Sequence, residues 1–73
     1  MTNERKIELI AEILDVEPGV LNQETKLSDL DEWDSIALIS FMAMIDDEFD
    51  KVVKGSIVKE QKRVADLMAL MWE

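Results

Sequence analysis

The sequence contains no cysteine, no histidine and no tyrosine among its 73 residues. Without cysteine, the chain cannot form a disulfide, supply a thiol nucleophile or build a cysteine metal site. Without histidine, it lacks a Ser-His-Asp triad, a Cys-His pair and every histidine metal ligand. Catalysis would depend on carboxylates, lysines and hydroxyls, and a chain this short offers little volume for a closed pocket. We therefore expect a protein that is not an enzyme.

Positive charge is also scarce, and it is unevenly distributed. The chain has 8 basic and 17 acidic residues, which gives a net charge of −9. Residues 27–50 hold eight acids and no base, whereas residues 51–66 hold five bases and two acids. This charge repels nucleic acid and anionic membranes, and it favours basic protein partners. We expect no nucleic-acid partner.

Long hydrophobic runs are absent as well. No uncharged run approaches the roughly 18 residues that a membrane-spanning helix needs. The first 14 residues, MTNERKIELIAEIL, interrupt their apolar positions with charges and do not resemble a signal peptide. We expect a cytoplasmic monomer that does not insert into membranes.

The N-terminal third predicts one helix followed by a long connection. Apolar side chains at helical spacing predict a helix over residues 3–14: Ile7, Ile10, Ile13 and Leu14. Thr2 or Asn3 can cap it, and Pro18-Gly19 prevents its continuation. Residues 15–33 then form a loop with a short turn near residues 27–30. Its apolar residues are expected to hold it on the core: Val16, Val20, Leu27, Leu30 and Trp33.

Asp34 marks the start of a second helix, expected from residue 35 to about residue 48 or 49. Its carboxylate can accept hydrogen bonds from first-turn amides, and its charge suits the positive end of the helix dipole. At 100° per residue, one face forms an apolar stripe: Leu38, Phe41, Met42, Ile45 and Phe49. A second apolar set lies away from this stripe: Ile36, Ile39 and Ala43.

This second apolar set has two interpretations, because the outer side of a surface helix normally carries charge. In the first, the long loop or the last helix covers these side chains. In the second, they form an exposed docking patch that is rimmed by acids: Asp34, Asp46, Asp47 and Glu48. The two interpretations differ in the solvent exposure that they require of Ile36, Ile39 and Ala43.

The remaining residues predict shorter elements. Gly55 permits a turn, and Ser56 is expected to cap a short turn that contains Ile57 and Val58. A last helix is expected over residues 62–72 with one apolar face: Val64, Leu67, Met68 and Met71. No segment alternates like a strand. The expected fold class is all-α, a small antiparallel bundle of three main helices plus a short fourth, with a long loop between helices 1 and 2.

The acids around Ser35 match neither a calcium loop nor a catalytic carboxylate pair. An EF-hand needs glycine at position six and glutamate at position twelve, and loops that start at Asp29 or Asp46 have neither. Acid–base catalysis needs one carboxyl that burial keeps protonated, whereas these acids occupy turns that we expect to be exposed. We therefore expect no metal site and no catalytic residue. Helix capping by Asp34 and attachment of a group at Ser35 both remain open.

The segment WDSIALISFMAMIDDEFD resembles the acyl carrier protein family around its phosphopantetheine serine. The family pattern is Asp-Ser-aliphatic, a helix and a closing acidic run before Phe, which Asp34-Ser35-Ile36 and Asp46-Asp47-Glu48-Phe49 supply. ERKIELIAEIL resembles the first helix of the family, and RVADLMALM resembles its last. The resemblance covers nearly the whole chain, so it implies a single acyl-carrier-like helical domain over residues 1–73.

The resemblance implies that Ser35 carries a covalent 4′-phosphopantetheine arm, whose terminal thiol holds acyl groups as thioesters. A phosphopantetheinyl transferase would install the arm from coenzyme A. An acyl-loading ligase or synthase and acyltransferases would be the other partners. The second helix would be the recognition element, with these partner-binding residues: Asp34, Ile36, Ile39, Ala43, Asp46 and Asp47.

Two departures from members in fatty-acid synthesis indicate a specialised pathway. Those members usually have acids early in the second helix, where residues 37–41 read ALISF, and fewer bases than the five in residues 51–63. The expected pathway is therefore a specialised lipid, polysaccharide or secondary-metabolite pathway. The alternative is a non-enzymatic acidic helical adaptor that binds a basic partner through its second helix, with Ser35 only capped or reversibly phosphorylated.

Overall fold

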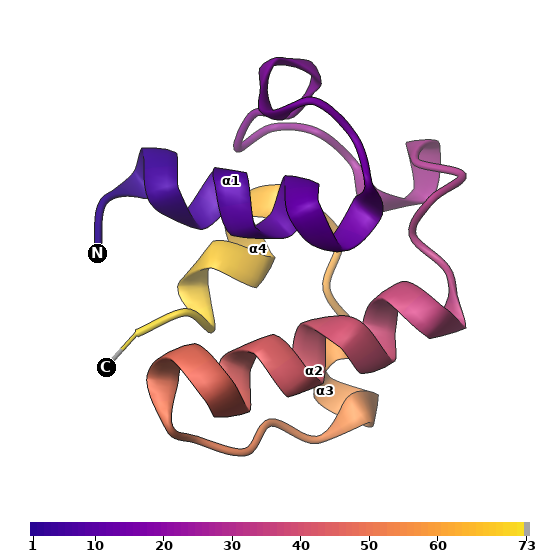
Figure 1. Ribbon diagram of the computed structural model, residues 1–73. Coiled ribbons are helices and arrows are strands. Elements are labelled where there is room, and N and C mark those ends of the chain that lie inside the picture. The colour runs from indigo at the N-terminus through magenta and orange to yellow at the C-terminus, as the bar shows by residue number, and fades with distance from the viewer. Residues whose placement is uncertain (73) are drawn as a thin grey trace.

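The computed structural model describes residues 1–72, which form two long and two short α-helices (Figure 1). In chain order these are α1 (Asn3–Leu14), α2 (Ser35–Phe49), α3 (Gly55–Lys59) and α4 (Val64–Ala69). Two 3-10 turns, η1 (Pro18–Val20) and η2 (Leu27–Asp29), lie in the loop between α1 and α2. The described residues contain no strand, and the predicted all-α class is confirmed.

Helix α1 has the bounds that the sequence predicts. The Thr2 hydroxyl caps it by accepting a hydrogen bond from the backbone N–H of Arg5 at 3.2 Å. The helix ends at Leu14, and the left-handed backbone of the C-cap residue Asp15 (φ 57°) lets its N–H reach carbonyls of the last turn. The fully buried side chains of α1 are Leu9, Ile10, Ala11 and Leu14, with Ile7 and Ile13 partly buried beside them.

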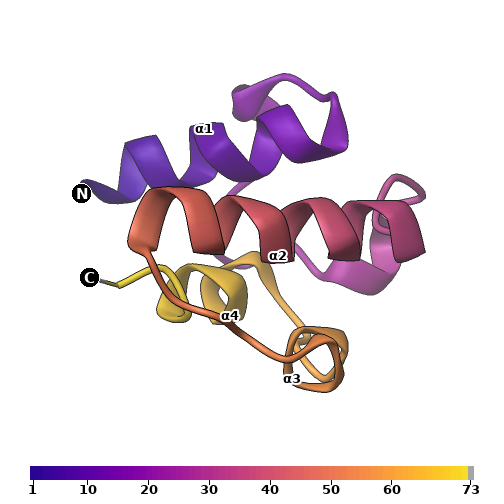
Figure 2. The ribbon, with the colours of Figure 1, turned by 60° about the horizontal axis from the view of Figure 1, so that its bottom comes forward.

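The core lies where α1, α2 and α4 meet. Helices α1 and α2 run in opposite directions, and α4 lies behind them in Figure 1 and below them in Figure 2. The largest completely enclosed side chains come from all four helices and the C-terminal turn: Phe41, Ile10, Ile45, Leu67, Met71, Val58 and Val64. Burial of side chains of this size contributes about 1.5–3 kcal/mol each before chain entropy is subtracted. Helix α3 packs against α2 at the edge of this core.

The loop over residues 15–33 is held by apolar contacts, although one predicted anchor is wrong. Leu27 is buried, and Val16, Leu30 and Trp33 are partly buried against the core. Val20 was expected to pack inward, but 61% of its surface is exposed. Because η1 turns the chain over Pro18–Val20, Leu21, the residue after Val20, is buried in the core instead.

The second half of this loop is tied to the segment that precedes α4. The N–H of Leu27 donates to the Lys62 carbonyl at 2.8 Å, and the N–H of Val64 donates to the Thr25 carbonyl at 2.9 Å. Lys26 and Arg63 form an isolated antiparallel bridge between the two segments. These backbone bonds bring Lys26 next to Lys62 and Arg63, which are far from it in the sequence.

The C-terminal elements are shorter than predicted. The last helix, expected over residues 62–72, spans Val64–Ala69, because the bonds to Leu70 and Met71 tighten into a 3-10 turn. The Asp66 carboxylate caps it by accepting from the backbone amides of Lys62 and Arg63 at 3.1 and 3.0 Å. The predicted apolar face is confirmed, since its four residues are buried: Val64, Leu67, Met68 and Met71.

The predicted cap at Ser56 is wrong. Helix α3 begins at Gly55, two residues before the start that a cap at Ser56 would give, and Lys54 occupies the N-cap position without a side-chain hydrogen bond. Ser56 therefore lies inside α3, where its side chain is exposed. The short turn around Ile57 and Val58 is present, and Val58 is fully enclosed.

The C-terminal turn is held at the end of the molecule opposite the start of α2 (Figure 1). The Lys51 Nζ lies 3.8 Å from the centroid of the Trp72 ring, a cation–π contact. Burial lowers the pKa of Lys51, and the nearby Lys6 ammonium lowers it further.

Candidate functional site

Ser35 is the first residue of α2, and its side chain is exposed. The helix is capped by its neighbour, because Asp34 Oδ1 accepts a hydrogen bond from the backbone N–H of Ala37 at 2.9 Å. The predicted N-cap is thus confirmed. Since Asp34 supplies the cap, the start of α2 does not need the Ser35 hydroxyl. That hydroxyl is left at the positive end of a 15-residue helix.

The segment before Ser35 is fixed by Trp33. Its indole packs edge-on against the enclosed Phe41 ring, with the ring centroids 6.2 Å apart and the planes at 78°. Its backbone N–H donates to the Leu30 carbonyl at 3.1 Å, at the end of η2. A half-buried aromatic ring therefore positions the residues that carry the cap and the serine.

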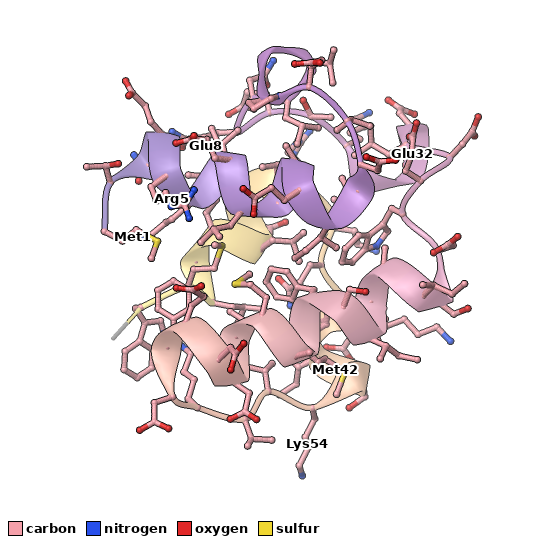
Figure 3. All side chains as sticks on the ribbon, in the orientation of Figure 1. Met1, Arg5, Glu8, Glu32, Met42 and Lys54 are labelled. Carbon is pink, nitrogen blue, oxygen red and sulfur yellow. The ribbon has the colours of Figure 1, made fainter. Side chains whose placement is uncertain are left out.

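A cleft of about 550 Å³ opens beside Ser35, between α2 and α3. Its lining residues are Trp33, Asp34, Ser35, Leu38, Ile39, Gly55 and Lys59, and we call it the serine cleft. Helix α3 comes close to α2 here, because a Cβ added at Gly55 would lie 3.4 Å from Met42 Sδ. Met42 lies on this side of α2, whereas Lys54 projects away into solvent (Figure 3). Gly55 and Lys59 carry no sequence signal for this role, since only packing brings α3 next to Ser35.

The outer side of α2 presents apolar side chains to solvent. Ile36 is 72% exposed and Ile39 is 65% exposed, and Ala43 is also exposed. The interpretation in which the loop or the last helix covers them is therefore wrong. Val52, at 84% exposure, lies with Ile39 and Ala43 around a shallow hollow of about 300 Å³. We call these four side chains the outer apolar face: Ile36, Ile39, Ala43 and Val52.

The opposite side of α2 matches the predicted stripe in part. Phe41, Ile45 and Phe49 are buried as expected. Leu38 and Met42 are only half-buried because they face α3 and the clefts beside it, and Ala37 is buried in addition. The buried side of α2 is thus rotated slightly toward α1.

The acids of the site lie at the two ends of the outer apolar face. Asp34 stands at the start of α2, while Asp46, Asp47 and Glu48 are exposed in its last turns. Asp47 and Glu48 line a groove of about 340 Å³ between α1 and α2, together with Glu12. Within residues 1–72, no acidic side chain is buried, and no three potential metal ligands come together. The arrangement is therefore a charged rim around apolar side chains.

Comparison with known proteins gives one match. A protein-family model described as "Phosphopantetheine attachment site" matches residues 7–71, a span that includes Ser35. No curated protein and no solved structure matches the chain. In the part of the chain that the structure describes, no helix combines the length and the apolar character needed to cross a membrane.

Proposed function

The chain belongs to the phosphopantetheine attachment site family, and from this premise we propose that Ser35 is the residue that carries the arm. Domains of this family are carriers that do not catalyse reactions, and they hold 4′-phosphopantetheine covalently on a serine. Among the serines of this chain, Ser35 is the one that begins a long helix. The orphan amides and dipole at a helix N-terminus favour an attached phosphate. The exposed position of Ser35 at the start of α2 is the observation that carries the proposal.

The residues around Ser35 fit such a group. The hydroxyl is exposed, and the adjoining serine cleft offers apolar walls from Trp33, Leu38 and Ile39. Asp34 opposes the charge of a phosphodiester, whereas Lys59 in the same cleft provides a compensating cation. When bound, the arm supplies a terminal thiol that holds an acyl group as a thioester, which suits a chain that has no cysteine of its own.

The family implies interaction with synthases, transferases and a phosphopantetheinyl transferase in general. We assign the docking of these enzymes to α2 and its rim: Asp34, Ile36, Ile39, Ala43, Asp46 and Asp47. The exposure of the outer apolar face supports this assignment, because such residues rimmed by charge suit a partner with an apolar hollow and a basic edge. We extend the proposal to one carrier domain over residues 1–73 that serves a specialised lipid, polysaccharide or secondary-metabolite pathway.

Intact mass tests the attachment. The purified chain is incubated with coenzyme A, Mg²⁺ and a phosphopantetheinyl transferase of broad specificity, and we expect its mass to increase by one arm. Ser35→Ala abolishes the increase. Ser28→Ala and Ser56→Ala, which remove other exposed hydroxyls, retain it. If the wild-type chain stays unmodified with several such transferases, the proposal fails and the acidic adaptor becomes the better explanation.

A further inference from the structure

A second cleft, of about 380 Å³, lies beside the serine cleft and has the opposite charge to most of the surface. Its walls include Lys26, Lys59, Lys62 and Arg63, together with Trp33 and Ser28. Four of the eight basic residues of the chain thus line one hollow, and no acidic residue lines it. We call this hollow the basic cleft.

The backbone holds these cations together in spite of their mutual repulsion. The bridge between Lys26 and Arg63, and the bond from the Leu27 N–H to the Lys62 carbonyl, place the η2 loop against the segment before α4. The carboxylate of Asp66, in the first turn of α4, accepts from the backbone amides of Lys62 and Arg63. The ion pair found within residues 1–72, between Arg5 and Glu12, lies on α1. The ammonium and guanidinium groups of the basic cleft are therefore available to an external anion.

The basic cleft continues from the serine cleft. Trp33 and Lys59 line both hollows, so one indole and one ammonium form the boundary between them. A group attached at Ser35 reaches this boundary by lying along the apolar walls of the serine cleft. Beyond the shared Lys59, the basic cleft presents Lys26, Lys62 and Arg63, so the two hollows form a continuous path that begins at Ser35 and ends at these three cations.

All four cations of the basic cleft are exposed to solvent. Exposed ion pairs are weak and are screened by salt, so a free anion would occupy the cleft only at high concentration. A group on a short flexible tether has an effective concentration on the order of millimolar, which can fill such a weak site. Resting on the proposed function of Ser35, we propose that the basic cleft binds the negatively charged end of the acyl group on the arm. The cargo is then an acyl group that ends in a carboxylate or a phosphate.

Two loaded forms of the protein test this proposal. A phosphopantetheinyl transferase loads the chain from succinyl-coenzyme A or from butyryl-coenzyme A, which supply four-carbon acyl groups with and without a terminal carboxylate. Intact mass first verifies each loaded form, and ¹H–¹⁵N spectra at low ionic strength then compare them. We expect the succinyl form to shift the amides of Ser28, Lys62 and Arg63, which line the basic cleft and not the serine cleft. The butyryl form leaves them near their positions in the protein with an unacylated arm.

Charge variants with a matched control sharpen the test. Lys62→Gln reduces the ratio of bound to unbound succinyl group roughly threefold, as the loss of one exposed ion pair should. Lys54→Gln makes the same change in net charge on a side chain that projects away from the clefts (Figure 3), and it leaves the succinyl shifts unchanged. Added salt weakens the shifts in the succinyl form.

The outcomes separate the two proposals. Equal spectra for the succinyl and butyryl forms, with loading verified by mass, would overturn the anionic cargo and leave Ser35 as the attachment site. Free succinate that saturates the unmodified chain at micromolar concentration would show a site for soluble anions, which also overturns the tethered assignment. A chain that gains no mass would overturn the proposed function, and this inference with it.

Discussion

Helices α1 and α2 bury similar faces and present different surfaces to solvent. Each has four fully buried positions, which are Leu9, Ile10, Ala11 and Leu14 in α1 and Ala37, Phe41, Ile45 and Phe49 in α2. The outer side of α1 carries charge at Glu4, Glu8 and Glu12. The outer side of α2 carries Ile36, Ile39 and Ala43 at positions that are also exposed.

This difference distinguishes surface features that folding explains from one that folding does not explain. The surface of α1 is explained by the core on one side and water on the other. The inner side of α2 is explained in the same way. Its outer apolar side chains gain little from folding, because they remain largely in water, and their grouping on one face is typical of a surface that binds a partner. The contrast between the helices therefore supports α2 as the element that meets partner enzymes.

Truncation of a large buried side chain should lower the free energy of unfolding by a similar amount in α1 and in α2. Phe49→Ala in α2 is expected to cost about 3–5 kcal/mol, and Ile10→Ala in α1 about 2–5 kcal/mol, because each leaves a cavity in the core. Urea denaturation followed by circular dichroism measures both losses. A cost below about 1 kcal/mol for Phe49→Ala would show that its ring does not belong to the core.

The two N-terminal caps should differ slightly in how much they stabilise the protein. Thr2→Ala removes the cap of α1 and Asp34→Ala removes that of α2, each at a cost of about 1 kcal/mol. Asp34 also places a negative charge at the helix dipole, which adds about 0.3–1 kcal/mol. Asp34→Asn is the control, because it keeps an acceptor oxygen and removes only the charge. Thermal denaturation that ranks Thr2→Ala as the more harmful change would contradict the comparison.

Substitutions on the exposed sides of the two helices should have the smallest effect on stability. On α2, such a substitution should instead impair the recognition of partner enzymes. Ile39→Glu changes the free energy of unfolding by no more than about 0.5 kcal/mol, because its side chain is exposed. It slows acyl transfer to or from the cognate enzyme, since a charge replaces an apolar contact. Glu8→Ile, the matched exchange on α1, leaves transfer unchanged. A loss of stability above about 2 kcal/mol for Ile39→Glu would show that the residue is part of the core.

Local signals in the sequence predict most of the fold. The bounds of α1 and α2 follow from the spacing of their apolar residues. The caps follow because Thr2 and Asp34 come directly before the first residue of each helix. The exposure of Ile39 also follows from its place on the helical wheel, once Phe41 and Ile45 fix the inner side. Each of these features depends on residues within a few turns of one another.

Features that depend on tertiary contacts were predicted less well. Val20 and Leu21 are adjacent apolar residues, and only the geometry of η1 decides which one is buried. The last helix stops early because its final turn tightens, which RVADLMALM does not reveal. The basic cleft joins Lys26 to Lys62 and Arg63 through backbone hydrogen bonds that leave no periodic pattern in the sequence.

Gly55 lies where α3 approaches α2, in the wall of the serine cleft. A methyl group at this position would touch Met42 Sδ at 3.4 Å and Leu38 Cδ2 at 3.6 Å, distances at which it fits without displacing either side chain. It would occupy the wall that the serine cleft now leaves open. Gly55→Ala would therefore narrow the cleft in which we propose that the arm lies, at a residue that takes no part in the proposed attachment.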